Sequence, residues 1–140
     1  MHAEVSLQVG VPRERAYSAY TDFQAMTRWS KKTKAVTVAK SEGNTVHLDI
    51  TSNGRQVVTA MRLFPPERVE SEAETRFTRI RNVVSFDEVE GGAKVTASMD
   101  VVFKGRWGWV LKTRGRAEAE SSAMEELSSF ARYVESLPPQ

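Results

Sequence analysis

The longest helical pattern of this sequence lies at residues 107–137, which read WGWVLKTRGRAEAESSAMEELSSFARYVESL. Gly115 interrupts the pattern, at a cost of about 1 kcal/mol relative to alanine, and indicates either a bend or close packing of helix on sheet. We expect an amphipathic helix of several turns over about residues 104–136, because apolar residues recur there at spacings of about three, four and seven. These residues are Val110, Leu111, Ala117, Met124, Leu127, Ala131 and Val134.

The chain before this helix alternates between apolar and polar residues with period two, the pattern of half-buried strands. Short connections with turn residues, Asn53-Gly54 among them, predict an antiparallel meander. Pro12 suits the first turn of a helix, and two short helices are expected at about 12–20 and 23–29. The expected strands cover about 3–9, 33–41, 44–52, 55–64, 67–75, 78–89 and 93–103.

One hairpin can be set in register from its charges. If residues 75–78 form the turn, Glu74 faces Arg79 and Glu72 faces Arg81 on neighbouring strands. Opposite charges across strands contribute about 0.2–1 kcal/mol each. This pairing predicts that the charged face of the sheet lies in solvent and that the alternate, small and apolar residues face the interior.

A single antiparallel sheet has one wet and one buried face, and the long helix is the only predicted element large enough to cover the buried one. A strongly twisted sheet of seven strands would curl around that helix. Small residues on the facing surfaces leave space between the two layers, and apolar cavities are the usual ligand sites. The small residues in question are Ser71, Ala73, Ala97, Ala117 and Ser121.

The composition is that of a globular protein, with 140 residues, 40% of them hydrophobic. We expect one domain over residues 1–140. The absence of cysteine excludes disulfides and thiol nucleophiles and fits a reducing interior. With no apolar signal core and no membrane-span pattern, we expect a cytoplasmic protein. His2 and His47 form no metal or catalytic motif, no phosphate loop is present, and no cofactor is expected.

Four local motifs stand out along the chain: Val11-Pro12, Tyr20-Thr21-Asp22-Phe23 through Trp29, Phe64-Pro65-Pro66-Glu67-Arg68-Val69, and Phe103-Lys104-Gly105-Arg106-Trp107-Gly108. In this order of elements they resemble the START-like helix-grip (SRPBCC) superfamily, in its polyketide cyclase/dehydrase and lipid-transport branch. The resemblance covers nearly the whole chain and implies an α+β helix-grip fold, with a seven-stranded curved antiparallel sheet around a long C-terminal helix in the order β-α-α-β6-α. It does not choose among functions, because fold does not imply function.

The first functional hypothesis is binding or transport of a hydrophobic small molecule, such as a lipid, an isoprenoid or a polyketide-like compound. One alternative is a polyketide aromatase/cyclase in which Asn82 and Arg114 orient a bound chain. Another is a protein-interaction domain similar to an Hsp90 activator. The residues expected to line the ligand cavity are Trp29, Leu48, Met61, Ala73, Ile80, Asn82, Val84, Ala97, Met99, Arg114, Ala117, Ser121 and Met124.

Trp29 stands at a corner between a short helix and the next strand. In a helix-grip fold it would either plug the corner between these elements and the long helix or line the cavity. A tryptophan suits both roles, because it buries a large apolar area and its N–H can reach a polar partner.

The stretch 104–116, KGRWGWVLKTRGR, combines basic residues with two tryptophans. Such a composition is typical of a contact with a membrane surface or a protein, and it also occurs where tryptophans simply pack on a sheet edge. A nucleic-acid patch is a further, less favoured interpretation. The residues expected to make a transient membrane-surface or protein contact are Lys104, Arg106, Trp107, Trp109 and Lys112.

Overall fold

A computed structural model describes residues 1–105 and 108–138, without the side chains of residues 108–114. Each expected strand and helix is present, with ends that agree to within a few residues, and the helix-grip fold is confirmed. The elements are β1 (His2–Val9), α1 (Arg13–Thr21), the 3-10 helix η1 (Phe23–Ala25), α2 (Met26–Trp29), β2 (Thr33–Glu42), β3 (Thr45–Ser52), β4 (Arg55–Phe64), β5 (Arg68–Glu74), β6 (Thr78–Val89), β7 (Gly92–Phe103) and α3 (Gly108–Ser136).

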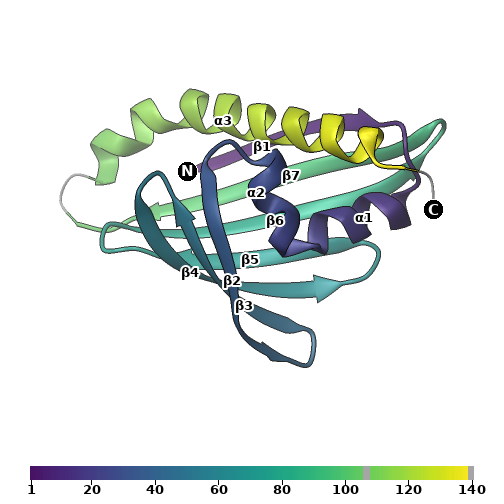
Figure 1. Ribbon diagram of the computed structural model, residues 1–140. Helices are drawn as coiled ribbons and strands as arrows, with labels where there is room; N and C mark the ends of the chain where they lie inside the picture. The colour runs from purple at the N-terminus through teal and green to yellow at the C-terminus, as the bar shows by residue number, and fades with distance from the viewer. Residues whose placement is uncertain (106–107, 139–140) are drawn as a thin grey trace.

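The strands form a single antiparallel sheet in the order β1-β7-β6-β5-β4-β3-β2. Strands β2 to β7 are a continuous meander, and its last strand, β7, pairs with β1. Figure 1 shows α3 running along one face of the curved sheet, with α1 and α2 beside it on the same face. Helix α3 contacts β1 and β7 most extensively, so it lies closer to the β1 edge of the sheet than to the β2 edge.

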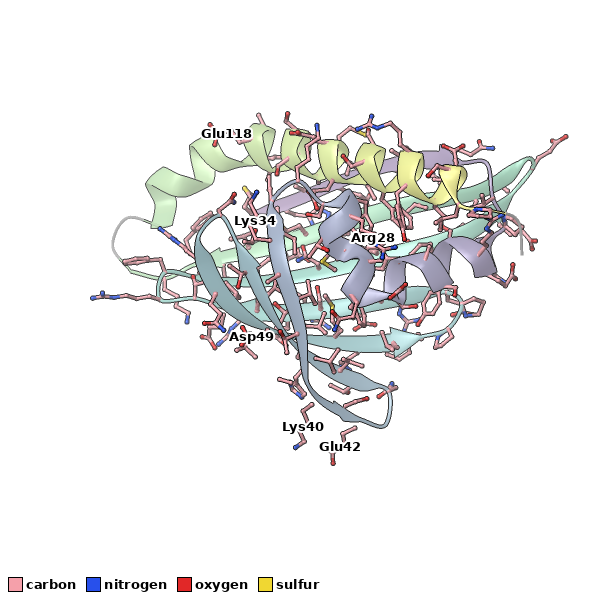
Figure 2. All side chains as sticks on the ribbon, viewed as in Figure 1. Arg28, Lys34, Lys40, Glu42, Asp49 and Glu118 are labelled. Carbon is pink, nitrogen blue, oxygen red and sulfur yellow. The ribbon has the colours of Figure 1, made fainter. Side chains whose placement is uncertain are left out.

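The predicted register of the β5–β6 hairpin is confirmed, since Glu74 pairs with Arg79 and Glu72 with Arg81. Arg79 Nη2 lies 3.6 Å from Glu74 Oε1, whereas the Arg81 guanidinium lies 3.6 Å from a carboxylate oxygen of Glu70, diagonally across the strands. These charges lie on the outer face. Exposed charged side chains also point away from the sheet along β2, where Figure 2 labels Lys40 and Glu42.

The core lies between the inner face of the sheet and the helices. Among its most completely buried large side chains are Phe86 from β6, Leu48 from β3, and Phe130 and Val134 from α3. Burial of such apolar surface is the main favourable term in folding. Among the described residues, no helix has the combined length and hydropathy that a membrane crossing requires.

Gly115 marks close packing of α3 on the sheet edge, one of the two interpretations offered above. A Cβ atom at this position would lie 3.3 Å from Sδ of Met1 and 4.0 Å from the ring of Phe103. Met1 is itself held there, because its amino group donates a hydrogen bond to the carbonyl of Val101 at 2.8 Å. Glycine therefore allows the first part of α3 to approach β1 and β7.

Candidate ligand-binding site

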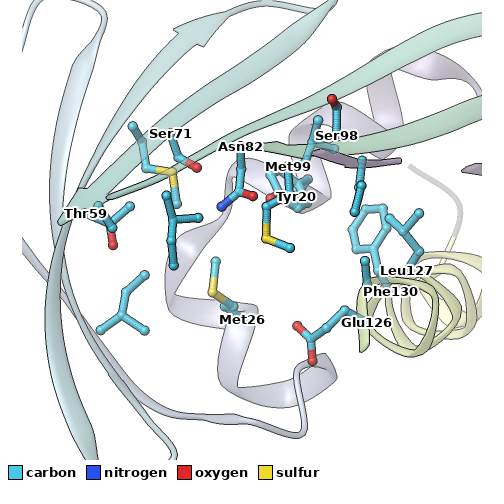
Figure 3. A pocket seen from close by; sticks show the side chains of 18 of the residues that line it. Tyr20, Met26, Thr59, Ser71, Asn82, Ser98, Met99, Glu126, Leu127 and Phe130 are labelled. Carbon is cyan, nitrogen blue, oxygen red and sulfur yellow. The ribbon is translucent and has the colours of Figure 1, made fainter. Parts of the chain in front are cut away.

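A cavity of about 310 Å³ lies between the curved sheet and the helices α1, α2 and α3. Its wall is mostly apolar, and Figure 3 shows side chains from the sheet and from the helices facing a common space. Cavities that bind small ligands have about this size and this mixture of many apolar and few polar groups. The lining residues are Ala3, Tyr20, Met26, Trp29, Ile50, Thr59, Met61, Ser71, Ala73, Ile80, Asn82, Val84, Ala97, Ser98, Met99, Ala123, Glu126, Leu127 and Phe130.

Small side chains create the space. Ser71 and Ala73 come from β5, Ala97 from β7 and Ala123 from α3, and all four lie on the cavity wall. The strand residues occupy alternate positions, so they share the inner face of the sheet. A large side chain at any of these sites would project into the cavity.

Aromatic rings close one end of the cavity. The ring of Trp29 lies 5.2 Å from that of Phe130 and 5.9 Å from that of Tyr20, measured between centroids. Tyr20 also contacts Phe86 at 5.7 Å in an edge-to-face arrangement. Such pairs contribute about 0.5–1.5 kcal/mol beyond their buried area. Trp29 thus packs at the corner next to α3 and also lines the cavity, so the two roles considered from the sequence occur together.

Two hydrogen-bond donors stand out near this end. The indole Nε1 of Trp29 is buried and has no hydrogen-bond partner among the described residues. Burial raises the pKa of the Tyr20 phenol to about 12, with a further contribution from the negative charge of Glu126. Tyr20 therefore remains a neutral hydrogen-bond donor at physiological pH.

Glu126 is the charged residue of the cavity wall. Its two carboxylate oxygens lie 3.0 and 2.8 Å from the hydroxyl of Ser30, which precedes β2. Burial raises the pKa of Glu126, although the Ser30 hydrogen bond and the charge of Lys32 oppose this rise. The carboxyl group is thus held where its charge is poorly solvated.

Asn82 lies on the sheet side of the cavity, as its strand phase predicts, and Figure 3 shows its amide directed into the space. Together with Tyr20 and Glu126, it gives the cavity one amide, one phenol and one carboxyl group. These groups can orient a polar substituent of a ligand, and the phenol or the carboxyl group can also transfer a proton. Among the described residues, no group of three or more histidine, aspartate or glutamate side chains is placed to hold a metal ion.

The structure brings most of the proposed lining residues together. Those on the cavity wall are Trp29, Met61, Ala73, Ile80, Asn82, Val84, Ala97 and Met99. Leu48 instead lies within the packed core, fully buried but outside the lining. The side chain of Arg114 lies outside the described residues.

The predicted facing of α3 was wrong for three residues. Ala117, Ser121 and Met124 are exposed rather than cavity-facing. The cavity is instead lined by Ala123, Glu126, Leu127 and Phe130, whose spacings of three and four define one helical face. Leu127 and Phe130 are an apolar pair on this face, and Ala123 lies four residues before Leu127. Counting back from the pair would therefore have given the correct buried face of the helix.

The basic stretch at the start of α3 is only partly described. Lys104 is exposed and contacts the carboxylate of Glu74. Arg106 and Trp107, as well as the side chains of Trp109 and Lys112, lie outside the described residues. A contact of this stretch with a membrane or protein therefore stays a prediction.

A second hollow, of about 590 Å³, lies between α1 and the end of α3. Its wall includes Arg15 and Asp22, so it is more polar than the first. The Arg15 guanidinium donates to the carbonyls of Leu137 and Pro138 at 2.6 and 2.5 Å. Arg15 thus holds the end of α3, and we regard this hollow as structural.

Comparison with known proteins identifies the family of this chain and structures that share its fold. The chain belongs to the polyketide cyclase/dehydrase and lipid transport family, whose model matches residues 9–122. The resemblance drawn from the sequence motifs is thereby confirmed. The family description also agrees with the expectation of a hydrophobic ligand. Comparison with curated protein sequences gave no match.

Several solved structures share the fold. The protein TTHA0849 from Thermus thermophilus is similar with a TM-score of 0.83 and 16% identity over 96% of this chain and 97% of that one. The Zhui aromatase/cyclase from Streptomyces sp. R1128 gives a TM-score of 0.81 and 12% identity over 96% and 93%. A START superfamily protein from Mycobacterium smegmatis gives 0.66 and 16% over 96% and 94%. At these identities the likeness shows the fold alone.

Proposed function

We propose that this protein binds or transports a hydrophobic small molecule in the cavity between the sheet and α3. The observation that carries the proposal is the cavity itself, of about 310 Å³, with a mostly apolar wall and few polar groups. Met26, Met61 and Met99 line it, and methionine side chains adapt to ligands of different shape. The absence of cysteine is compatible with a reducing compartment and supports placing this binding in the cytoplasm.

The test is native mass spectrometry of the purified protein, followed by organic extraction of whatever co-purifies. We expect a stoichiometric apolar ligand that is lost in Ala97→Phe, because the new ring would fill the cavity. Val102→Phe is the matched control, since it adds a ring to the exposed side of the same strand, where Val102 is 58% exposed. If no ligand is found, and lipids, quinones and aromatic polyketides give no thermal shift, the proposal fails.

Catalysis on a bound polyketide chain is the second candidate function. It is supported by the convergence of Asn82, Tyr20 and Glu126 on one cavity, and by the family, which includes polyketide cyclases. The discriminating variant is Asn82→Ala, assayed with a linear poly-β-ketone. If it retains binding and loses product formation, catalysis is supported. If the wild type binds this chain without converting it, the protein acts as a carrier.

A contact with an anionic lipid surface is proposed for the turn of the β5–β6 hairpin, at residues 75–77. Phe77 is 60% exposed, Arg76 lies 5.5 Å from its ring centroid, and the Lys104 amide donates to the Phe77 carbonyl. Exposed aromatic and basic groups together suit such a surface. We expect Phe77→Ser to weaken binding to anionic vesicles, whereas Val58→Ser, at a site 61% exposed on β4, leaves it unchanged. Equal binding of both variants would contradict the contact.

A further inference from the structure

The charge on the cavity wall is negative and comes from Glu126. Within the described residues, Glu126 is the only ionisable carboxylate or basic side chain among those that line it. Figure 3 shows it projecting from α3 into the space that the Asn82 amide enters from the sheet. A charge in a mostly apolar cavity is costly to bury, so its presence there bears on what the cavity accepts.

The carboxylate keeps free acceptor capacity. An ionised carboxylate has about four acceptor sites, and a hydroxyl supplies one proton. The Ser30 hydroxyl is the donor to Glu126 among the described residues, and Ser30 Oγ also lies 3.0 Å from the Thr33 hydroxyl. At least one oxygen of Glu126 can therefore accept a hydrogen bond from a ligand.

The negative charge is also not neutralised by close contact. No ion pair joins Glu126 to any side chain that the structure describes. Lys32, half-buried beside Ser30, attracts the charge without an ion pair. The field of Glu126 reaches the cavity end formed by Tyr20, since it contributes to the raised pKa of that phenol.

We propose that Glu126 is a specificity-determining residue that selects hydrophobic molecules with a hydrogen-bond-donating head group, a hydroxyl or an amine, and rejects those that end in a carboxylate. This inference rests on the proposed function of the cavity and names the ligand class. A like charge a few ångströms away in a partly apolar site lowers affinity by at least about tenfold. A donor group gains the acceptor that Ser30 leaves free.

A matched series of ten-carbon ligands tests the inference: 1-decanol, decylamine and decanoate. The affinity of each ligand is measured by its displacement of the neutral fluorescent probe N-phenyl-1-naphthylamine from the protein. The titrations are made at pH 8, which is above the ordinary pKa range of a carboxyl group. We expect the wild type to bind decanol and decylamine at least about tenfold more tightly than decanoate. In Glu126→Gln this ratio falls to about threefold or less for decanol, mainly because decanoate binds more tightly.

Glu125→Gln is the control, because it removes the same charge from the adjacent position of α3, where the side chain is exposed and pairs with Lys31 at 3.7 Å. It should leave the ratio unchanged. A merely structural role for Glu126 would alter the melting temperature of Glu126→Gln without altering the ratio. Glu126→Met, which also removes the charge, checks that the result does not depend on the introduced amide.

Two failures are distinguishable. If probe and ligands bind but the wild type does not discriminate, or Glu126→Gln discriminates as the wild type does, the inference is overturned and the proposed function stands. If neither the probe nor any of the three ligands binds to the wild type, the proposed function fails and the inference fails with it.

Discussion

Replacing Phe130 with alanine should destabilise the protein strongly. Phe130 is 1% exposed, and its ring contacts those of Trp29 and Tyr20 at 5.2 and 5.6 Å. Phenylalanine-to-alanine changes in cores cost about 3–5 kcal/mol. Because Phe130 already borders the cavity, part of its surface lacks packing partners, and we expect the lower end, about 3 kcal/mol.

This loss converts into a measurable shift in melting temperature. At roughly 2.1 cal/mol/K per residue, the entropy of unfolding of a 140-residue chain is about 0.3 kcal/mol/K. A loss of about 3 kcal/mol therefore lowers the melting temperature by about 10 °C. Differential scanning calorimetry measures the shift, and unfolding in urea gives the free energy independently.

Met124→Ala is the matched control on the same helix. Met124 is 38% exposed, so its truncation should cost less than about 0.5 kcal/mol and shift the melting temperature by less than about 2 °C. If α3 instead had the phase that the sequence pattern indicated, Met124 would face inward and its truncation would cost about 2–5 kcal/mol. A larger shift for Met124→Ala than for Phe130→Ala would refute the observed phase of the helix.

Three further predictions concern stability. The pKa of the Glu126 carboxyl group is raised by burial, so the folded state binds its proton more tightly than the unfolded state does. The stability that this protonation contributes is lost as pH rises through the raised pKa. In urea unfolding, wild-type stability should therefore fall over this pH range relative to that of Glu126→Gln. The pKa of Glu70 is lowered, chiefly by a hydrogen bond from Arg68, so its contribution is present above the ordinary pKa and lost as pH falls through the lowered one; Arg68→Met should flatten this acid limb of the stability profile, and an unchanged limb would contradict it. Gly92→Ala should lower the melting temperature far more than Gly43→Ala, because a Cβ at Gly92 would lie 2.0 Å from a backbone carbonyl of β1 and nothing lies within 4 Å of one at Gly43; similar melting temperatures would show that β1 and β7 do not pair this closely.

The sheet could be predicted from the sequence because its signals are local. Period-two alternation indicates where each strand lies, and the short turns indicate that consecutive strands pair with each other. Asn53 and Gly54 both adopt positive φ, as a tight hairpin turn requires. The charges of Glu74 and Arg79 indicate the correct register because they are close in sequence as well as in space. Strand phase then gave most of the cavity wall, including Asn82.

The wall contributed by α3 could not be predicted in the same way. The stripe chosen from the sequence included Ala117 and Met124, because small and apolar residues occur on more than one face of this helix. Which face of α3 is buried depends on how the helix packs on the sheet. The residues that make this contact are far apart in the sequence. Glu126 was missed because carboxylates are seldom buried without a partner, and its partner, Ser30, is 96 residues earlier.

The phase of α3 therefore determines both the packing and the chemistry of the cavity. Glu126 lies between Ala123 and Phe130 on one helical face, so the side chain that carries the charge is fixed by the same rotation that buries the ring. A rotation by one residue, about 100°, would bring Met124 inward and move the carboxylate away. The pair Phe130→Ala and Met124→Ala thus measures more than stability: a large loss for the first and almost none for the second is also required if Glu126 is to select ligands by their charge.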